Sequence, residues 1–333
     1  MALTWELRES DREFFAKELD SFVPNRIFDA HAHLYKFSHW GYAHPTIVGP
    51  SVVTLEEYGS QIEWLTPGRH TTGLFFGVAF HDGFREANEF VAREVAKDFS
   101  CSGEMLVSPR MDPEEMRAEV RRLKFRGIKV YHTFVTTKPS WTANISEYLT
   151  EEHVRIADQE GWTITLHMVK HRALADPSNQ QEIRYYCQKY PNIKLILAHA
   201  ARGFNPFHTI EGIRALKGLG NVWCDTSAVT EAGGFEAIIE TLGHERLLWG
   251  SDYPLSHLRG RCVAIGDRFL WLHEDTLNWK TAGANTPIDL LFVGHESLRA
   301  LKLAAMRLHL SDSQIEDIFY NNARKMLEIS GSN

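Results

Sequence analysis

The stretch Phe28-Asp29-Ala30-His31-Ala32-His33-Leu34 places two histidines two residues apart in an apolar run. On a β-strand, residues two apart point to the same side, so both imidazoles are predicted to face one interior space. A buried imidazole without a partner costs free energy, and two of them side by side invite a cation that satisfies both lone pairs. A pair of hydrogen-bonded core histidines is the alternative, and the short motif by itself does not separate the two.

This stretch belongs to the first of a series of short apolar runs bounded by turn residues. Amphipathic stretches separate most of the runs, and nearly continuous apolar strands that alternate with helices are typical of a parallel sheet covered on both faces. Eight such units predict an α/β fold that closes into a (β/α)8 TIM barrel. The predicted strands are Ile27 to Leu34, Thr72 to Phe80, Glu104 to Ser108, Gly127 to His132, Thr163 to Met168, Lys194 to Ala200, Asn221 to Thr226 and Leu247 to Ser251.

Helix signals lie between these strands and at both ends of the chain. Asp112 is a predicted N-cap, with Pro113 at the first helical position and Gly127 just past the end. An opening helix over about Ser10 to Phe22 and a closing helix that begins at the Ser311-x-x-Gln314 capping box are expected to flank the barrel.

The length of 333 residues suits one barrel with insertions, since such barrels take roughly 250 residues. We therefore expect a single domain over 1–333, with 1–25 as an N-terminal helical flank and 26–330 as the barrel. Tyr35 to Arg69 after the first strand and Tyr253 to about Gly294 after the last exceed ordinary loop length. Both would overhang the C-terminal rim, so we interpret them as substrate-covering segments; ornamental packing or an oligomer contact is the alternative.

Composition and charge narrow the class of partner. With 36 basic and 43 acidic residues the formal charge is −7, which argues against nucleic acid and favours a small molecule. No C-x-x-C pair occurs among the 4 cysteines, so a reducing compartment fits. The charged N-terminal segment does not resemble a signal peptide and no run is long enough for a membrane span, so we expect a cytoplasmic protein without a membrane partner. A homodimer is the default oligomeric expectation.

Polar side chains stand at the ends of three further predicted strands. His167, His199 and Asp252 close the fifth, sixth and eighth strands. In a barrel those ends converge on one rim, which brings these residues together with His31 and His33. Four imidazoles and a carboxylate suit Zn²⁺ best, and Mn²⁺, Fe²⁺ or Co²⁺ also accept such donors.

Several motifs carry a resemblance to a known family. F-D-A-H-A-H, the strand-terminal His167, L-A-H-A-A around His199 and L-L-W-G-S-D-Y-P around Asp252 resemble the amidohydrolase superfamily, in particular its amidohydrolase-related branch of metal-dependent TIM-barrel enzymes. The closing segment Ile318 to Ala323 is also similar to that branch. The branch contains hydrolases and also metal-dependent decarboxylases, such as aminocarboxymuconate semialdehyde decarboxylase, so the motifs indicate the superfamily's chemistry more than a substrate.

The resemblance implies that His31, His33, His167 and Asp252 ligate one divalent metal ion. It implies for His199 either a further ligand or, preferentially, a residue that orients water or polarises the substrate. Asp252 has a second implied role, in which it accepts a proton from the attacking water and returns it to the leaving group. A bound cation lowers the pKa of its water towards roughly 7, and a neighbouring carboxylate can shuttle the proton.

Lys129, in the predicted fourth strand, has three open interpretations. Binuclear members of the superfamily place a carboxylated bridging lysine in this strand, and the resemblance leaves that arrangement as the less favoured one. Related mononuclear sequences can carry a lysine there as a substrate contact, which we favour. The third interpretation is a lysine on the outer barrel face that reaches solvent, because a buried lysine needs a counter-charge or an altered pKa.

Further polar residues near the rim are candidates for substrate binding. Arg110 and Arg202 follow the third and sixth strands and can clamp a substrate carboxylate, although surface ion pairs are the alternative for each. His132 is a further candidate contact and His81 a weaker one, since such residues are more often satisfied loop histidines. Asp225 is interpreted either as support for a ligating histidine or as a turn residue.

Three functions are compatible with these residues. The leading one is a metal-dependent hydrolase that uses activated water on a C–N or C–O bond (amide, lactone or ester) of a small, carboxylate-bearing substrate. The second is a metal-dependent non-oxidative decarboxylase that uses the same site and releases CO₂ without consuming water. The third is a non-catalytic, metal-stabilised barrel, which predicts a coordinatively closed site, since catalytic zinc keeps an open position.

Overall fold

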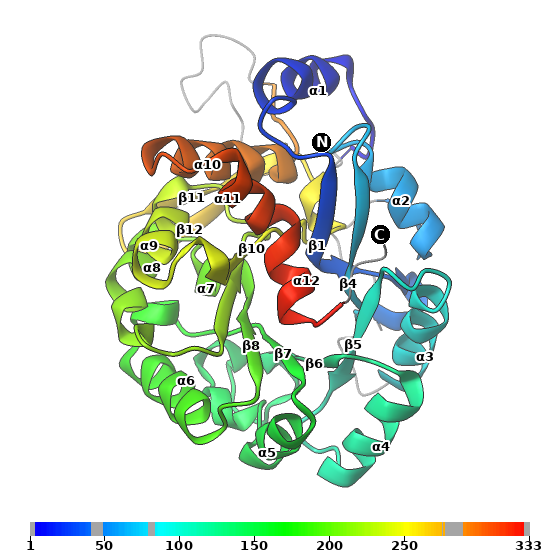
Figure 1. Cartoon of the computed structure of the whole chain (residues 1–333), viewed down its shortest axis with the longest axis vertical. Helices are drawn as coiled ribbons and strands as arrows, with labels where there is room; N and C mark the ends of the chain where they lie inside the picture. Colours follow the sequence, from blue (N-terminus) through cyan, green and yellow to red (C-terminus); the bar gives the residue numbers. More distant parts are fainter. Residues whose placement is uncertain (1–3, 41–48, 79–83, 275, 277–288, 330–333) are drawn as a thin grey trace.

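In the computed structural model, which describes residues 4–40, 49–78, 84–274, 276 and 289–329, eight parallel strands form the predicted barrel (Figure 1). Consecutive barrel strands are neighbours all the way from β1 to β10. The last strand returns to the first, because the Ala30 N–H donates to the Trp249 carbonyl at 2.9 Å and the Asp252 N–H donates to the His31 carbonyl at 2.7 Å. The barrel strands are β1 (Arg26–His33), β4 (His70–Phe76), β5 (Ser102–Val107), β6 (Gly127–Val130), β7 (Thr163–Leu166), β8 (Lys194–Leu197), β9 (Val222–Asp225) and β10 (Leu247–Leu248).

Helices surround the barrel, which buries the strands on both faces (Figure 1). In α4 the Asp112 carboxylate accepts two backbone N–H groups of the first turn, and Pro113 opens the helix as predicted. The helix ends at Leu123 rather than beside Gly127, because Lys124 adopts the left-handed conformation that stops it. Within the described residues, no helix has the length and apolar character needed to cross a membrane. The helices are α1 (Glu9–Phe14), α2 (Leu55–Ile62), α3 (Phe84–Val95), α4 (Pro113–Leu123), α5 (Glu151–Glu160), α6 (Pro177–Lys189), α7 (Ala198–Arg202), α8 (Pro206–Gly212), α9 (Ala232–Leu242), α10 (Val293–Arg307), α11 (Asp312–Glu316) and α12 (Asn322–Met326).

All eight barrel strands end earlier than predicted, and two of these early ends bear on the candidate site. β6 stops at Val130 instead of His132, because its partner β7 ends at Leu166, directly opposite Val130. β8 stops at Leu197 instead of Ala200, because its pairing with β9 goes no further. The chain is free to turn where the pairing stops, and both of these turns carry side chains of the candidate site.

The last helix, α12, closes the end of the barrel at which the strands begin. Met326 of α12 and the adjacent Leu327 pack against Phe28, Leu74 and Leu248 inside the barrel. The opposite end, where the C-terminal ends of the strands meet, is therefore the mouth.

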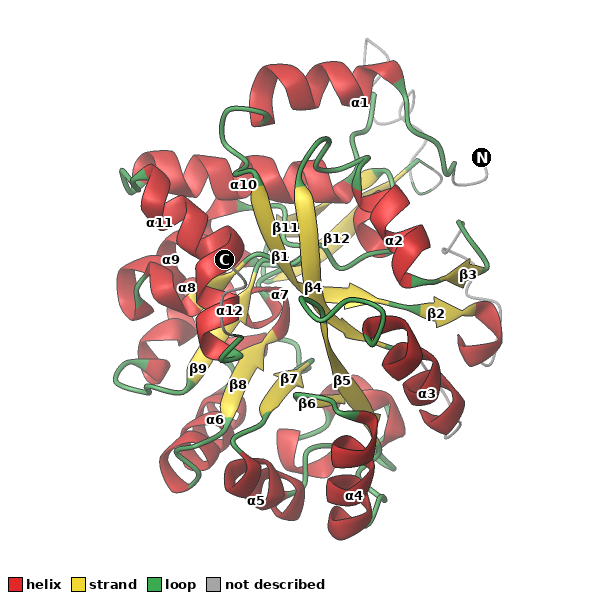
Figure 2. Ribbon diagram, turned by 45° about the vertical axis from the view of Figure 1, so that its right-hand side comes forward, coloured by secondary structure: helices red, strands yellow, loops and turns green. Residues whose placement is uncertain are grey.

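Both long segments form insertions with their own secondary structure (Figure 2). The first contains a short antiparallel pair and then α2, and the second contains a β-hairpin that precedes α10. The hairpin is fixed at its tip, where the Asp267 carboxylate lies 3.0 Å from both His171 Nε2 and His208 Nε2. The insertion strands are β2 (Tyr35–Lys36), β3 (Val52–Val53), β11 (Gly260–Ile265) and β12 (Arg268–His273).

The N-terminal flank is held by a buried ion pair. The opening helix, predicted over about Ser10 to Phe22, is observed as α1 followed by a π-helical turn over Phe15–Leu19. Both outer nitrogens of Arg259 donate to the Asp11 carboxylate, at 2.9 and 2.5 Å, and both side chains are buried. Because Arg259 directly precedes β11, this pair ties the flank to the second insertion.

Candidate metal centre

A β-bulge in β1 turns both histidines of the opening stretch into the barrel. Phe28 and Ala30 face the interior, where they pack in the cluster closed by α12. If the strand alternated regularly from these two residues, His31 and His33 would point outward. Both side chains point inward as predicted, but regular alternation is not the reason. The pairing of β1 with β4 shifts register just after Asp29, and such a bulge reverses the side on which the following residues lie.

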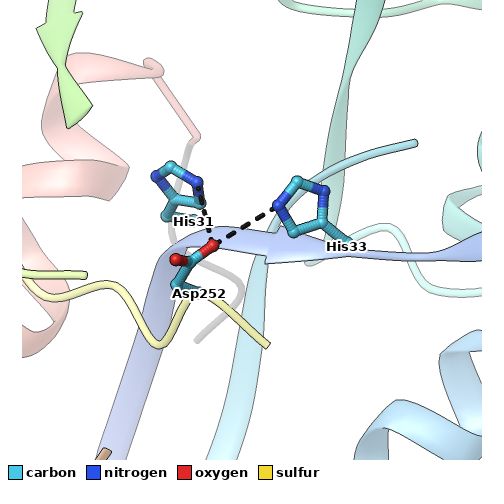
Figure 3. A group of neighbouring side chains, drawn as sticks. All are labelled: His31, His33 and Asp252. Atoms are coloured by element: carbon cyan, nitrogen blue, oxygen red, sulfur yellow. Dashed lines mark ion pairs between the residues drawn. The ribbon is translucent and has the colours of Figure 1, made fainter. Parts of the chain in front are cut away.

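His31, His33 and Asp252 form a tight, buried group in which both rings point toward one carboxylate oxygen (Figure 3). Asp252 Oδ1 lies 3.5 Å from His31 Nε2 and 3.4 Å from His33 Nε2. One ligand atom from each residue lies within 4.8 Å of the other two, close enough to hold a single metal ion. Gly250 permits this approach of the two chain segments, because a Cβ at that position would lie only 2.8 Å from His31 Cβ.

The outer ring nitrogens of the two histidines are held by the scaffold. His31 Nδ1 lies 2.8 Å from Asp225 Oδ2, and both side chains are buried. His33 Nδ1 lies 3.2 Å from the carbonyl oxygen of Gly77. Acceptors at Nδ1 favour the tautomer that leaves the Nε2 lone pair toward Asp252, as in metal-binding histidines generally. Asp225 therefore supports His31, the first of its two predicted interpretations.

His199 reaches the group from a left-handed turn. In α7, His199 and the next two residues have φ values of 59°, 50° and 59°, so the segment is a left-handed turn rather than a regular α-helix. Asp225 Oδ1 accepts the His199 N–H at 2.9 Å, which stabilises the turn. The His199 ring centroid lies 4.9 Å from that of His31, and Nδ1 lies 3.8 Å from Asp252 Oδ2.

His167 lies beside His199 rather than in the tight group around Asp252. Its ring centroid is 5.0 Å from that of His199 and 5.7 Å from that of His132, with which it stacks. Its Nδ1 is buried and has no hydrogen-bond partner among the described residues. The structure thus brings His167 to the same rim, in contact with the histidine that touches Asp252.

Burial favours the neutral forms of the His31 and His167 rings, while Asp252 stays charged. Burial, followed by the charge of Lys129, lowers the pKa of His31 well below its ordinary value. Burial lowers the pKa of His167 in the same way, with help from His199. For Asp252 burial acts upward, but the neighbouring His33, His199 and His31 rings lower its pKa on balance. Neutral imidazoles and an ionised carboxylate are the protonation states that ligate metals.

This donor set fits a divalent metal ion. Imidazole nitrogens combined with a carboxylate oxygen are typical zinc ligands. Asp252 Oδ2 is buried and accepts no hydrogen bond from the described residues. A buried carboxylate oxygen without a donor is costly, and a cation beside it removes that cost.

Lys129 faces the barrel interior, so its interpretation as an outer-face lysine is wrong. Its side chain is fully buried, with Nζ 3.5 Å from His31 Nε2 and 4.4 Å from the ring centroid of Phe76. Burial lowers the pKa of Lys129 to about 8, although the neighbouring carboxylates oppose the shift. A lysine in this place can act on a substrate or on a second metal site, which leaves the other two interpretations open.

Arg202 extends from the end of the left-handed turn and lies beside two aromatic rings that contact each other. Its guanidinium carbon lies 5.9 Å from the ring centroid of Phe204 and 5.6 Å from that of Phe269. Phe269 belongs to β12, so the hairpin supplies one of the two walls. Among the described residues no carboxylate forms an ion pair with Arg202. A guanidinium held against aromatic rings and without an internal counter-charge is suited to an anionic ligand.

The remaining predicted contacts fall in different places. His132 is partly buried, stacks on His167 and has its Nδ1 3.0 Å from Ser140 Oγ. Arg110 is exposed and lines a cavity of about 330 Å³ between α3 and α4, whose lining includes none of the histidines. His81 lies outside the described residues. The structure therefore places His132, but not Arg110, against the histidine group.

Sequence reasoning missed three polar residues of the centre. Ser227 Oγ lies 2.9 Å from His199 Nδ1 and 3.2 Å from His31 Nδ1. Asp29 on β1 and Glu104 on β5 are both fully buried, and burial raises the pKa of Glu104 to about 7. The signal that could have found these two carboxylates is a charged residue inside a predicted apolar strand. Ser227 carries no such signal.

The fold and the site define a class: TIM-barrel enzymes with a His-His-Asp centre at the mouth. The amidohydrolase family model matches residues 28–329. The chain belongs to the amidohydrolase family and is an enzyme of that type, which confirms the resemblance and sets aside the non-catalytic interpretation.

Part of the chain is also similar to a curated enzyme. It is 29% identical over 117 residues to the L-fucono-1,5-lactonase of Burkholderia ambifaria, which is 30% of this chain and 39% of the lactonase. The match thus spans less than half of the lactonase.

Three solved structures share the whole fold. A candidate 2-pyrone-4,6-dicarboxylic acid hydrolase from Pseudomonas putida has a TM-score of 0.60 at 17% identity, over 93% of this chain and 100% of that one. A zinc-bound amidohydrolase from Burkholderia multivorans has a TM-score of 0.59 at 14% identity, over 91% and 99%. The 5-carboxyvanillate decarboxylase from Sphingomonas paucimobilis has a TM-score of 0.58 at 14% identity, over 92% and 100%. Identities this low show a common fold and do not show that the substrates are the same.

Proposed function

We propose that this chain is a metal-dependent hydrolase that opens a C–O or C–N bond, in the first place the ester bond of a lactone, in a small substrate that bears a carboxylate. The observation that carries the proposal is the His31, His33 and Asp252 group, whose ligand atoms lie within 4.8 Å of one another. The names of two similar proteins, a lactonase and a 2-pyrone-4,6-dicarboxylic acid hydrolase, favour a cyclic ester.

One zinc ion is part of the proposal, held by His31, His33, His167 and Asp252. The zinc bound in the similar Burkholderia multivorans structure supports this choice over Mn²⁺, Fe²⁺ or Co²⁺. When bound, such an ion supplies a Lewis acid and lowers the pKa of a water to about 7. A binuclear site with a carboxylated Lys129 is the less favoured form.

The chain's own residues then divide the work. Asp252 takes a proton from the attacking water at its free Oδ2 and returns it to the leaving oxygen. His199, fixed at Nδ1 by Ser227, presents its other face to the substrate carbonyl. Lys129 and His132 contact the substrate from the floor and the side of the mouth, and Arg202 binds its carboxylate.

We also place the protein in the cytoplasm, with a small molecule as its partner. All four cysteines, Cys101, Cys187, Cys224 and Cys262, are free thiols, which suits a reducing compartment.

Hydrolysis is tested with a panel of carboxylated lactones in H₂¹⁸O. We expect one ¹⁸O atom in the product carboxylate, no CO₂, loss of activity after chelation and recovery with zinc. Two of the similar folds are decarboxylases, so decarboxylation is the alternative that this experiment must separate from hydrolysis. Release of CO₂ without ¹⁸O incorporation would establish the decarboxylase instead.

Arg202→Met is expected to lower kcat/KM for the carboxylated substrate by about 10- to 100-fold, the value of a hydrogen bond to a charged group. Methionine keeps an apolar stem beside Phe204 and Phe269, so the aromatic wall is preserved. The measurement compares the substrate with its methyl ester, for which the variant and the wild type should be equal. Arg155→Met, on the exposed face of α5, is the matched control. An equal loss on both substrates would contradict a carboxylate contact.

A further inference from the structure

Asp29 is a fully buried carboxylate on β1, two residues before His31. A charge in this place is tolerated only if donors surround it. Its Oδ1 accepts the backbone N–H of His31 at 3.0 Å and that of Ser251 at 2.9 Å. Its Oδ2 accepts the Tyr58 hydroxyl at 2.7 Å. One side chain therefore joins the β1 bulge, the segment after β10 and helix α2 of the first insertion.

The two backbone contacts lie on either side of the metal centre. The bulge of β1 interrupts its regular ladder, and an amide at such a point needs another acceptor. Asp29 accepts the amide of His31 there. Ser251 directly precedes Asp252, which has a left-handed backbone with φ of 59°. A single oxygen atom thus anchors the backbone of the first histidine and the backbone next to the aspartate that faces it.

The third contact connects the centre with the first insertion. Tyr58 is buried, and its ring meets those of Phe75 and Tyr253 edge to face, with centroids 4.8 and 5.7 Å away. Tyr253 follows Asp252 in the chain. The hydroxyl of Tyr58 is thus held by packing and directed at Asp29.

We propose that Asp29 is a positioning residue, which holds the β1 bulge against the segment after β10 and so sets the spacing of His31, His33 and Asp252. This inference rests on the proposed function in that the spaced group is taken to bind zinc. Asp29 acts through the backbone, because it accepts the N–H groups of His31 and of Ser251, the residue before Asp252. Loss of Asp29 is therefore expected to change metal affinity and coordination geometry first, and to change activity through them.

The test measures zinc affinity of the full chain by competition with a chromophoric chelator, together with the visible spectrum after cobalt loading. Asp29→Ala removes the oxygen that accepts both amides. It is expected to weaken zinc binding about 10- to 100-fold, as removal of outer supports of metal ligands does, and to change the cobalt spectrum. In Asp29→Asn the amide oxygen still accepts both N–H groups, so zinc affinity should stay near wild type. Tyr58→Phe leaves both amides bound and should also bind zinc nearly as wild type does.

Asn88→Ala is the matched control. Asn88 is buried in a part of the barrel remote in sequence from the ligands. Its Oδ1 accepts the Leu106 N–H at 2.9 Å, and its Nδ2 donates to the Leu106 carbonyl at 3.0 Å. This variant should lose stability and keep its zinc affinity. An equal loss of affinity in Asn88→Ala, or in Tyr58→Phe, would overturn the assignment to the two amides.

The remaining outcomes are also decisive. A wild-type chain that binds no zinc would overturn the proposed function and the Asp29 assignment with it. A wild-type chain that binds zinc, with unchanged affinity and cobalt spectrum in Asp29→Ala, would overturn the assignment alone. If circular dichroism shows that Asp29→Ala does not fold, Asp29→Ser takes its place with the same expectation and the same criterion.

Discussion

Replacing Asp252 by asparagine is expected to lower kcat by about 10²- to 10⁴-fold, the usual contribution of a general base, while most of the zinc is retained. Asparagine keeps an oxygen that can face the Nε2 atoms of His31 and His33, now 3.5 and 3.4 Å from Asp252 Oδ1. It loses the second carboxylate oxygen, which is buried and accepts no hydrogen bond from the described residues. An amide nitrogen in that place cannot take a proton. Steady-state kinetics and metal analysis of the same preparations separate the two effects.

Asp312→Asn is the control for this substitution, because Asp312 is exposed at the start of α11, outside the barrel. Both kcat and zinc content should match the wild type. Full activity of Asp252→Asn on an identified substrate would show that another group takes the proton. Loss of the metal along with activity would show that the charge of Asp252 matters for binding before it matters for turnover.

His31→Ala is expected to abolish metal binding, with a loss of affinity greater than the roughly 100-fold that outer supports contribute. Both ring nitrogens of His31 have side-chain contacts: Nδ1 lies 2.8 Å from Asp225, and Nε2 lies 3.5 Å from both Asp252 and Lys129. Its removal leaves Asp225 with one fewer donor and opens a space next to a buried lysine. Metal content after dialysis, and activity with and without added zinc, give the measurement.

His132→Ala is the matched comparison. It removes an imidazole at the same mouth that stacks on His167 and binds Ser140 but faces no carboxylate of the group. Its zinc content should equal that of the wild type. Retention of zinc by His31→Ala, or equal depletion in both variants, would contradict the ligand set.

Much of the architecture could be read from local patterns. The eight apolar runs correspond to the eight strands. The family motifs lie within residues 28–329, the range that the amidohydrolase family model matches. Asp112 and Ser311 cap their helices as their positions predict. The rule that strand ends converge also brought His167, His199 and Asp252 to one rim. Whether they ligate a metal stays a prediction.

Some residues could not be placed from the sequence because their positions depend on neighbours that the sequence does not reveal. Arg110 follows its strand as Arg202 does, yet it turns outward between α3 and α4. Lys129 could not be assigned to the inner or outer face, since the register of β6 depends on its pairing with β5 and β7. Asp225 had two open interpretations, and the position of His31, far away in the chain, decides between them.

The sequence by itself determined which residue types close each strand and that the strands form a barrel, because apolar periodicity and capping act between residues close in the chain. The folded chain was needed to show that a bulge, rather than alternation, aims His31 and His33 at Asp252, and that the carboxylates of Asp29 and Asp225 both contact His31. The physical reason is that register shifts and shared hydrogen bonds arise between strands distant in sequence, where a single buried carboxylate takes donors from several of them.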